Sequence, residues 1–120
     1  MLKKQSMNSL KLILTLVLFT GLSAFTTNAQ KIKTETFKVW GNCNTCKKNI
    51  ENSLDVKGVK SANWDKATHL LTVVFKEKKI SIDQIHKYIA KAGYDTEKEK
   101  ADDKAYQALP DCCRYERRKL

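Results

Sequence analysis

The segment TETFKVWGNCNTCKKNIENSL, residues 34–54, joins a strand pattern to a helical pattern through two closely spaced cysteines. Apolar and polar residues alternate over residues 34–40, which predicts a half-buried strand with Phe37 and Val39 facing inward. A glycine and an asparagine then break the pattern. Residues 45–54 place apolar side chains one helical turn apart among charged ones, and this spacing predicts an amphipathic helix.

A hairpin and a second helix are expected downstream. Residues 59–64 and 69–75 alternate in hydrophobicity on either side of a short polar turn, which is typical of two antiparallel strands. The second helix is expected over residues 82–92. It should begin at the capping box Ser81-Ile-Asp-Gln84, in which serine and glutamine side chains bond the first backbone N–H groups. Gly93 suits the position that follows a helix end.

A short strand over residues 94–100 would complete the order βαββαβ. This order predicts an α+β fold of the ferredoxin-like kind, with a four-stranded antiparallel sheet, two helices on one face, and a C-terminal extension. The side chains expected to close the core are apolar and come from every element: Phe37, Val39, Ile50, Leu54, Val59, Trp64, Leu71, Val73, Phe75, Ile82, Ile85 and Ile89.

Residues 1–29 have the parts of a secretory signal peptide: early lysines, an apolar run, and small residues before the expected cleavage site. The apolar run is shorter than the ~20 residues of a transmembrane helix. We therefore expect cleavage rather than stable membrane insertion. The expected organisation is a signal peptide over 1–29, one domain over 30–100 and an extension over 101–120, in a monomeric protein that is periplasmic or secreted.

The chain is basic, with a formal net charge of +10 that falls to +7 without the three lysines of residues 1–29. Such a charge can indicate nucleic acid or an anionic membrane as a partner. The lysines are spread along the chain, however, and an exported protein rarely meets nucleic acid. We expect a solvated basic surface and no nucleic-acid partner.

Cys43 and Cys46 fall at the start of the first predicted helix. Free backbone N–H groups and the positive end of the helix dipole favour thiolates there, and Lys47 and Lys48 add positive charge nearby. Two thiolates on a loop suit a soft ion of low coordination number, such as Cu(I) or Hg(II). A closed structural zinc site would need four ligands.

The same cysteine spacing is also found in thiol–disulfide redox proteins, so a periplasmic redox enzyme is one alternative. The thioredoxin-like fold of such enzymes needs more strands than this chain offers, and a cis-proline that faces the cysteines. The only proline in the sequence, Pro110, lies beyond the predicted sheet. A disulfide within the pair would close too short a loop to stabilise much. The sequence offers no other catalytic arrangement, and we expect a binding protein rather than an enzyme.

A second cysteine pair, Cys112-Cys113, lies in the extension. To reach the first pair the chain must return the length of a strand, ~20 Å. A helix over residues 102–109 covers ~12 Å, and an extended Pro110-Asp111 adds enough to bring the pair close. Cys112 and Cys113 are therefore candidate additional ligands. With them the protein would be a sequestering or sensing module that holds Zn(II) or Cu(I) more tightly; a vicinal disulfide and inert surface thiols are the alternatives.

The strand, the loop Gly41-Asn-Cys-Asn-Thr-Cys46, the helix, and the segments GVKSANWDKATHLLTVVF and ISIDQIHKYIAKAGYD together resemble the heavy-metal-associated (HMA) domain family. That family includes copper chaperones, a periplasmic mercury-binding protein and modules of metal-pumping P-type ATPases. The resemblance implies that Cys43 and Cys46 are the metal ligands and that Tyr94 shields the metal. It also implies transfer, most readily of Cu(I), to a P-type ATPase or another acceptor with a CxxC pair.

One position departs from the family pattern. The family usually has a buried methionine two residues before the first cysteine, and this chain has Gly41 there, so the inward position has no side chain of its own. Elsewhere we expect Trp64 to belong to the core. We expect His69, distant from Cys43, and His86 to be ordinary surface residues rather than ligands.

Overall fold

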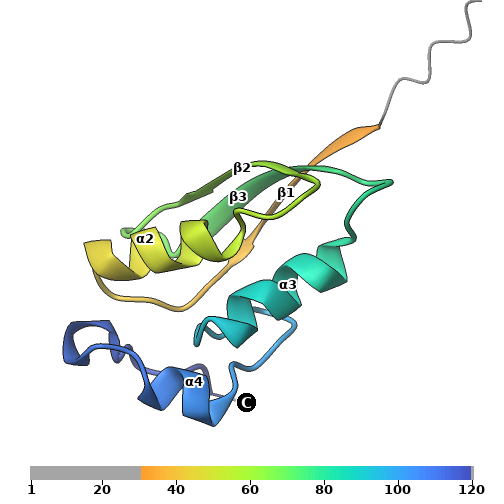
Figure 1. The fold of residues 1–120 in the computed structure, drawn as a ribbon. Helices are drawn as coiled ribbons and strands as arrows, with labels where there is room; N and C mark the ends of the chain where they lie inside the picture. Colours follow the sequence, from red (N-terminus) through yellow and green to blue (C-terminus); the bar gives the residue numbers. More distant parts are fainter. Residues whose placement is uncertain (1–30, 120) are drawn as a thin grey trace, which may run out of the picture.

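A computed structural model describes residues 31–119 of the chain. Its elements in chain order are β1 (Ile32–Lys38), α2 (Asn44–Ser53), β2 (Val59–Trp64), β3 (Leu70–Lys76), α3 (Ile82–Lys91), α4 (Asp103–Gln107) and the 3₁₀ helix η1 (Asp111–Cys113) (Figure 1). The expected signal peptide, residues 1–29, lies outside the described residues. Within residues 31–119, no helix has the length and apolar character that a membrane crossing requires.

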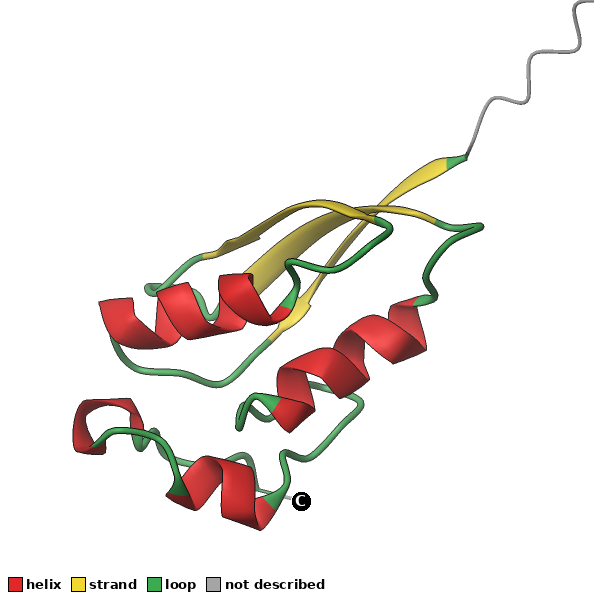
Figure 2. Ribbon diagram, in the orientation of Figure 1, coloured by secondary structure: helices red, strands yellow, loops and turns green. Residues whose placement is uncertain are grey.

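The three strands form an antiparallel sheet in the order β1-β3-β2. The register places Leu71 of β3 between Phe37 of β1 and Trp64 of β2, and all three side chains are buried. Helices α2 and α3 cover this face of the sheet (Figure 2). The expected core residues are buried, except that Val59 and Ile82 are only half-buried. The core also includes residues that were not expected there: Cys46, Ile80, Tyr94, Leu109, Cys113 and Tyr115.

The four-stranded sheet expected from the sequence is wrong, because the fourth strand is reduced to a single bridge between Val39 and Thr96. The chain turns back immediately after this bridge. The Thr96 backbone N–H donates to the Glu99 carbonyl at 2.7 Å, and the Thr96 hydroxyl accepts from the Glu99 N–H at 3.0 Å. Both backbone groups of Glu99 are used within this turn, so they are not free to extend a ladder along β1.

Helix α3 begins and ends as expected. Ser81 and Gln84 form both bonds of the capping box. Gly93, just past the helix end, has φ +104°, a conformation that favours glycine. A side chain there would also collide with the tail, because an added Cβ would lie 2.9 Å from the Ala105 carbonyl oxygen. The same glycine therefore permits both the helix end and the close approach of α4.

The two histidines differ from expectation. His86 is buried, with its Nδ1 2.6 Å from the Thr96 hydroxyl and its ring 4.0 Å from that of Phe37, so the surface assignment is wrong. Burial lowers the pKa of His86, and Lys98 lowers it further. His69 is half-buried, stacks on Trp64 with 5.6 Å between ring centroids, and lines a cavity with Gly41 and Asn42. It thus lies close to the cysteine loop rather than far from it.

Candidate metal centre

Cys43 and Cys46 lie where the sequence predicted, at the beginning of α2. Cys43 is the N-cap residue in an extended conformation, and its sulfur accepts the Cys46 backbone N–H at 3.3 Å. The two sulfurs are 3.1 Å apart. A position usually held by Ser, Thr, Asp or Asn is thus taken by a thiol, whose charged form the free N–H groups of a helix start would stabilise.

Trp64 occupies the space beneath the cysteine loop. An added Cβ on Gly41 would lie 3.0 Å from the Trp64 ring and 3.3 Å from the Cys46 Cβ, so no larger residue fits there without movement. The indole Nε1 of the fully buried Trp64 donates to the Val39 carbonyl at 3.0 Å. The side chain missing from the loop is therefore replaced by one from the end of β2.

Local hydrogen bonds lower the pKa of the first cysteine. Burial raises the pKa of Cys43, but the hydrogen bonds from the Cys46 side chain and backbone, and from Cys113, outweigh it and lower the pKa overall. Lys47, which the sequence predicted to add positive charge near the cysteines, bonds other groups. Its ammonium group donates to Glu51 at 2.7 Å and also to Asn63 and the Trp64 carbonyl, which ties α2 to β2.

The C-terminal tail brings the second cysteine pair to the first. Helix η1 packs against the start of α2 (Figure 1), and the Cys113 sulfur lies 3.6 Å from that of Cys43. Cys112 and Cys113 have their sulfurs 3.7 Å apart, and the sulfurs of Cys43, Cys112 and Cys113 all lie within 4.8 Å of one another. Among the described residues, none of the four cysteines forms a disulfide.

The path of the tail differs in detail from the expected one. Its helix is shorter than residues 102–109, and the residues after Pro110 form η1 instead of an extended segment. The two cysteines of this turn consequently have different environments. Cys113 is fully buried, and its carbonyl lies 3.9 Å from the Cys46 sulfur, whereas Cys112 is exposed.

Tyr94 is buried between α2 and the tail. Its hydroxyl accepts from Asn49 at 2.9 Å, and its ring stacks on that of Tyr115 with centroids 5.5 Å apart. Burial raises the pKa of Tyr94, and the nearby sulfurs of Cys46 and Cys113 raise it further, against the Asn49 hydrogen bond. The Tyr94 phenol is therefore neutral and lies near the sulfurs of Cys46 and Cys113.

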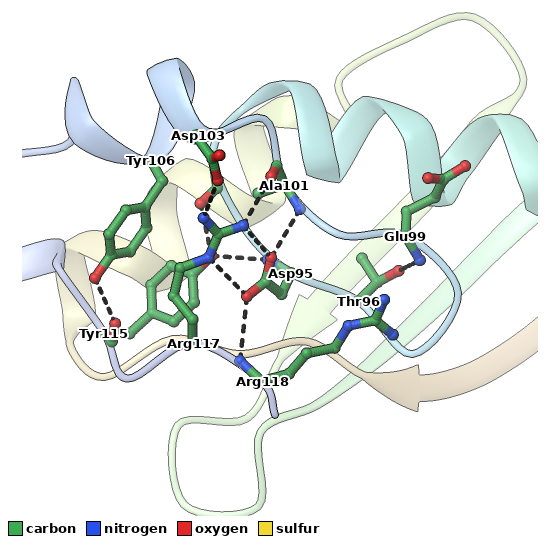
Figure 3. A network of polar contacts seen from close by, with 10 residues as sticks. Asp95, Thr96, Glu99, Ala101, Asp103, Tyr106, Tyr115, Arg117 and Arg118 are labelled. Atoms are coloured by element: carbon green, nitrogen blue, oxygen red, sulfur yellow. Dashed lines mark hydrogen bonds and ion pairs between the residues drawn. The ribbon is translucent and has the colours of Figure 1, made fainter. Parts of the chain in front are cut away.

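The residues that anchor the tail are ones that sequence reasoning missed. Arg117 donates through Nη2 and Nε to the two oxygens of Asp95, at 2.8 and 3.0 Å, in a bidentate pair (Figure 3). The Tyr115 hydroxyl donates to the Gly93 carbonyl at 2.7 Å and accepts the Asp95 backbone N–H at 2.8 Å. We call these three residues, Asp95, Tyr115 and Arg117, the clasp.

The clasp lies in a largely dry environment. Asp95 is fully buried, and its carboxylate also accepts the Ala101 N–H at 2.7 Å and the Arg118 N–H at 3.2 Å. Burial raises the pKa of Asp95, but the bonds from Arg117 and the backbone outweigh it and lower the pKa overall. An aspartate directly after the Gly-Tyr turn and an arginine-rich tail were the available signals, but nothing local joins them.

Comparison with known proteins decides the family. The model of the heavy-metal-associated domain matches residues 36–95, half of the chain. The chain belongs to this family. The predicted resemblance is thereby confirmed, and the domain is a heavy-metal-binding one of the metallochaperone type, a family that is typically non-enzymatic. The match ends before the tail, so Cys112, Cys113 and most of the clasp lie outside the family domain.

Solved structures agree on the HMA fold. The CopZ metallochaperone is 29% identical, with a TM-score of 0.52 over 53% of this chain and 98% of that one. Oxidized MerP from Ralstonia metallidurans CH34 is 28% identical, with a TM-score of 0.53 over 55% and 94%. The water-soluble region of the P-type ATPase CopA from Bacillus subtilis is 29% identical, with a TM-score of 0.53 over 56% and 46%. No curated protein matches the sequence significantly.

Proposed function

We propose that this HMA protein binds Cu(I) through the thiolates of Cys43 and Cys46 and passes it to an acceptor with its own CxxC pair. The observation that carries the proposal is the 3.1 Å separation of these two sulfurs at the capped start of α2. Thiolates are the ligands that soft ions prefer. Two cysteines at a helix start are thus suited to capture such an ion and to exchange it by ligand replacement.

The choice of metal and acceptor rests on chemistry and on similarity. Two of the similar structures belong to CopZ, a metallochaperone, and to CopA, a P-type ATPase. Cu(I) is therefore our first choice of cargo, with Hg(II) or Zn(II) as alternatives, and the acceptor is a copper-transporting ATPase or a cuproprotein. We further propose export by residues 1–29, a domain over 30–100 with an extension over 101–120, and a monomeric protein in the periplasm or outside the cell.

Two other functions would use the same thiols. A sequestering or sensing role is favoured by the Cys113 sulfur, 3.6 Å from that of Cys43, because additional ligands slow release. A thiol–disulfide redox role would use the close Cys43–Cys46 pair as its dithiol.

Two assays separate these functions. We expect the Cu(I)-loaded protein to transfer its metal to a purified CxxC domain of a copper ATPase under anaerobic conditions, and not to accelerate reduction of insulin disulfides by dithiothreitol. Cu(I) measured on both proteins after their separation on a column reports the transfer. Metal kept by the donor against excess acceptor would favour sequestration, whereas rapid insulin reduction that persists with a Cu(I) chelator would contradict the proposal.

A further inference from the structure

We propose that Cys113 is a third thiolate ligand of the metal bound by Cys43 and Cys46, and that the clasp holds it in place. The tail is then a built-in part of the metal site that must release before the metal leaves. This inference rests on the proposed metal binding and adds to it a ligand and a control over release.

The separations of the Cys43 sulfur from those of Cys46 and Cys113 suit a shared ion. Three thiolates that surround one ion at ~2.3 Å lie ~4 Å from one another. The Cys43–Cys113 separation of 3.6 Å is already near this value, and that of Cys43 and Cys46, 3.1 Å, needs only a small opening. Three-thiolate coordination is well suited to a soft monovalent ion such as Cu(I).

Burial distinguishes Cys113 from its neighbour. Cys113 is fully buried and contacts Cys43 through its sulfur and Cys46 through its carbonyl. Cys112 is exposed, and its sulfur lies 3.7 Å from that of Cys113 and within 4.8 Å of that of Cys43. We therefore assign the third ligand to Cys113 and keep Cys112 as its matched control.

The clasp explains why η1 stays beside the cysteine loop. Helix η1 contacts the cysteine loop through Cys113, whose sulfur and carbonyl lie near the sulfurs of Cys43 and Cys46. The chain just after η1 is fixed more firmly, by Tyr115 and by the buried Asp95–Arg117 pair. The Arg117 guanidinium also lies over the Tyr106 ring, 4.8 Å from its centroid. Opening the tail would leave the Asp95 carboxylate without its charge partner, which is costly for a buried group.

Release to an acceptor would then be a ligand exchange with an added step. As an acceptor thiolate bonds to the metal, the Cys113–metal bond breaks, and the metal keeps its oxidation state. Because η1 packs on the start of α2, the acceptor reaches the metal only as the tail moves away. The tail thus slows transfer and makes it depend on the clasp.

Four single variants of the full chain test the inference: Cys113→Ser, Cys112→Ser, Arg117→Gln and Arg114→Gln. Arg114 is the matched arginine, since it is exposed and its partners within residues 31–119 are Asp111 at 3.5 Å and the Gln107 carbonyl at 3.5 Å. Cu(I) affinity is measured by competition with a chromophoric chelator, the number of sulfur ligands by X-ray absorption, and the transfer rate by stopped flow with an ATPase CxxC domain.

We expect Cys113→Ser to weaken Cu(I) binding by about 10-fold or more, to reduce the sulfur ligands from three to two, and to speed transfer. Arg117→Gln should speed transfer with Cys113 still present, while Cys112→Ser and Arg114→Gln should behave as the wild type. Circular dichroism verifies that each variant is folded. Tight two-sulfur binding in the wild type, or equal losses for Cys112→Ser and Cys113→Ser, would overturn this inference alone. Absence of tight Cu(I) binding in the wild type would overturn the proposed function as well.

Discussion

We expect Trp64→Ala to lower the free energy of unfolding by about 4 kcal/mol, in the range of large core truncations. Trp64 is fully buried, and its indole occupies the space that a side chain at Gly41 would need. Its removal also leaves the Val39 carbonyl without the donor that lies at 3.0 Å. Urea unfolding followed by circular dichroism at 222 nm measures the change.

Trp40→Ala is the matched control. Trp40 is half-buried, and its ring carries the Lys38 ammonium 4.6 Å from the centroid. Loss of such an exposed cation–π contact costs about 1 kcal/mol. Equal destabilisation by the two substitutions would contradict the view that the cysteine loop is supported by Trp64 rather than by Trp40.

The second large effect is expected for Asp95→Ala, which should destabilise the protein by about 3–5 kcal/mol, as for a buried ion pair that loses one member. The Arg117 guanidinium would lose its buried carboxylate partner, and the Ala101 N–H would lose its acceptor. Asp103→Ala removes another carboxylate bonded to the same arginine, at 2.7 Å, but from a side chain that is 73% exposed. It should cost no more than about 1 kcal/mol.

The same aspartate predicts a dependence on pH. The folded protein lowers the pKa of Asp95, so its contribution to stability is present above the unfolded value of ~3.9 and is lost as pH falls through the folded pKa. The difference in stability between the wild type and Asp95→Ala should therefore begin to narrow below about pH 4 and shrink further as the pH falls. Urea midpoints measured from pH 7 to pH 3 report this, and a constant difference across the range would contradict the assignment.

The sequence predicted most of the fold because its signals are local. Alternation in β1, β2 and β3, the Ser81–Gln84 capping box and Gly93 each act within a few residues, and each is present as expected. The fourth strand failed for an equally local reason that is harder to read. The Thr96 side chain bonds the backbone two and three residues ahead and closes a turn where a strand would continue.

The CxxC part of the site was predictable from the sequence. The approach of the second cysteine pair was predictable only in outline. A CxxC pair between a strand and a helix indicates a metal site directly. That Cys113 comes within 3.6 Å of Cys43 depends on contacts between residues far apart in sequence, such as Asp95 with Arg117 and Tyr94 with Tyr115. Likewise, the space left by Gly41 is filled from β2 by Trp64. Periodicity carries no information about such pairings.

The central claim is that this domain binds a soft metal ion through Cys43 and Cys46. Anaerobic titration of the reduced protein with Cu(I), in competition with a chromophoric chelator, tests it most directly when the Cys43→Ser/Cys46→Ser double variant is titrated beside the wild type. We predict one tightly bound Cu(I) per wild-type chain and none per double variant. A double variant that still takes up Cu(I) as tightly as the wild type would contradict the account.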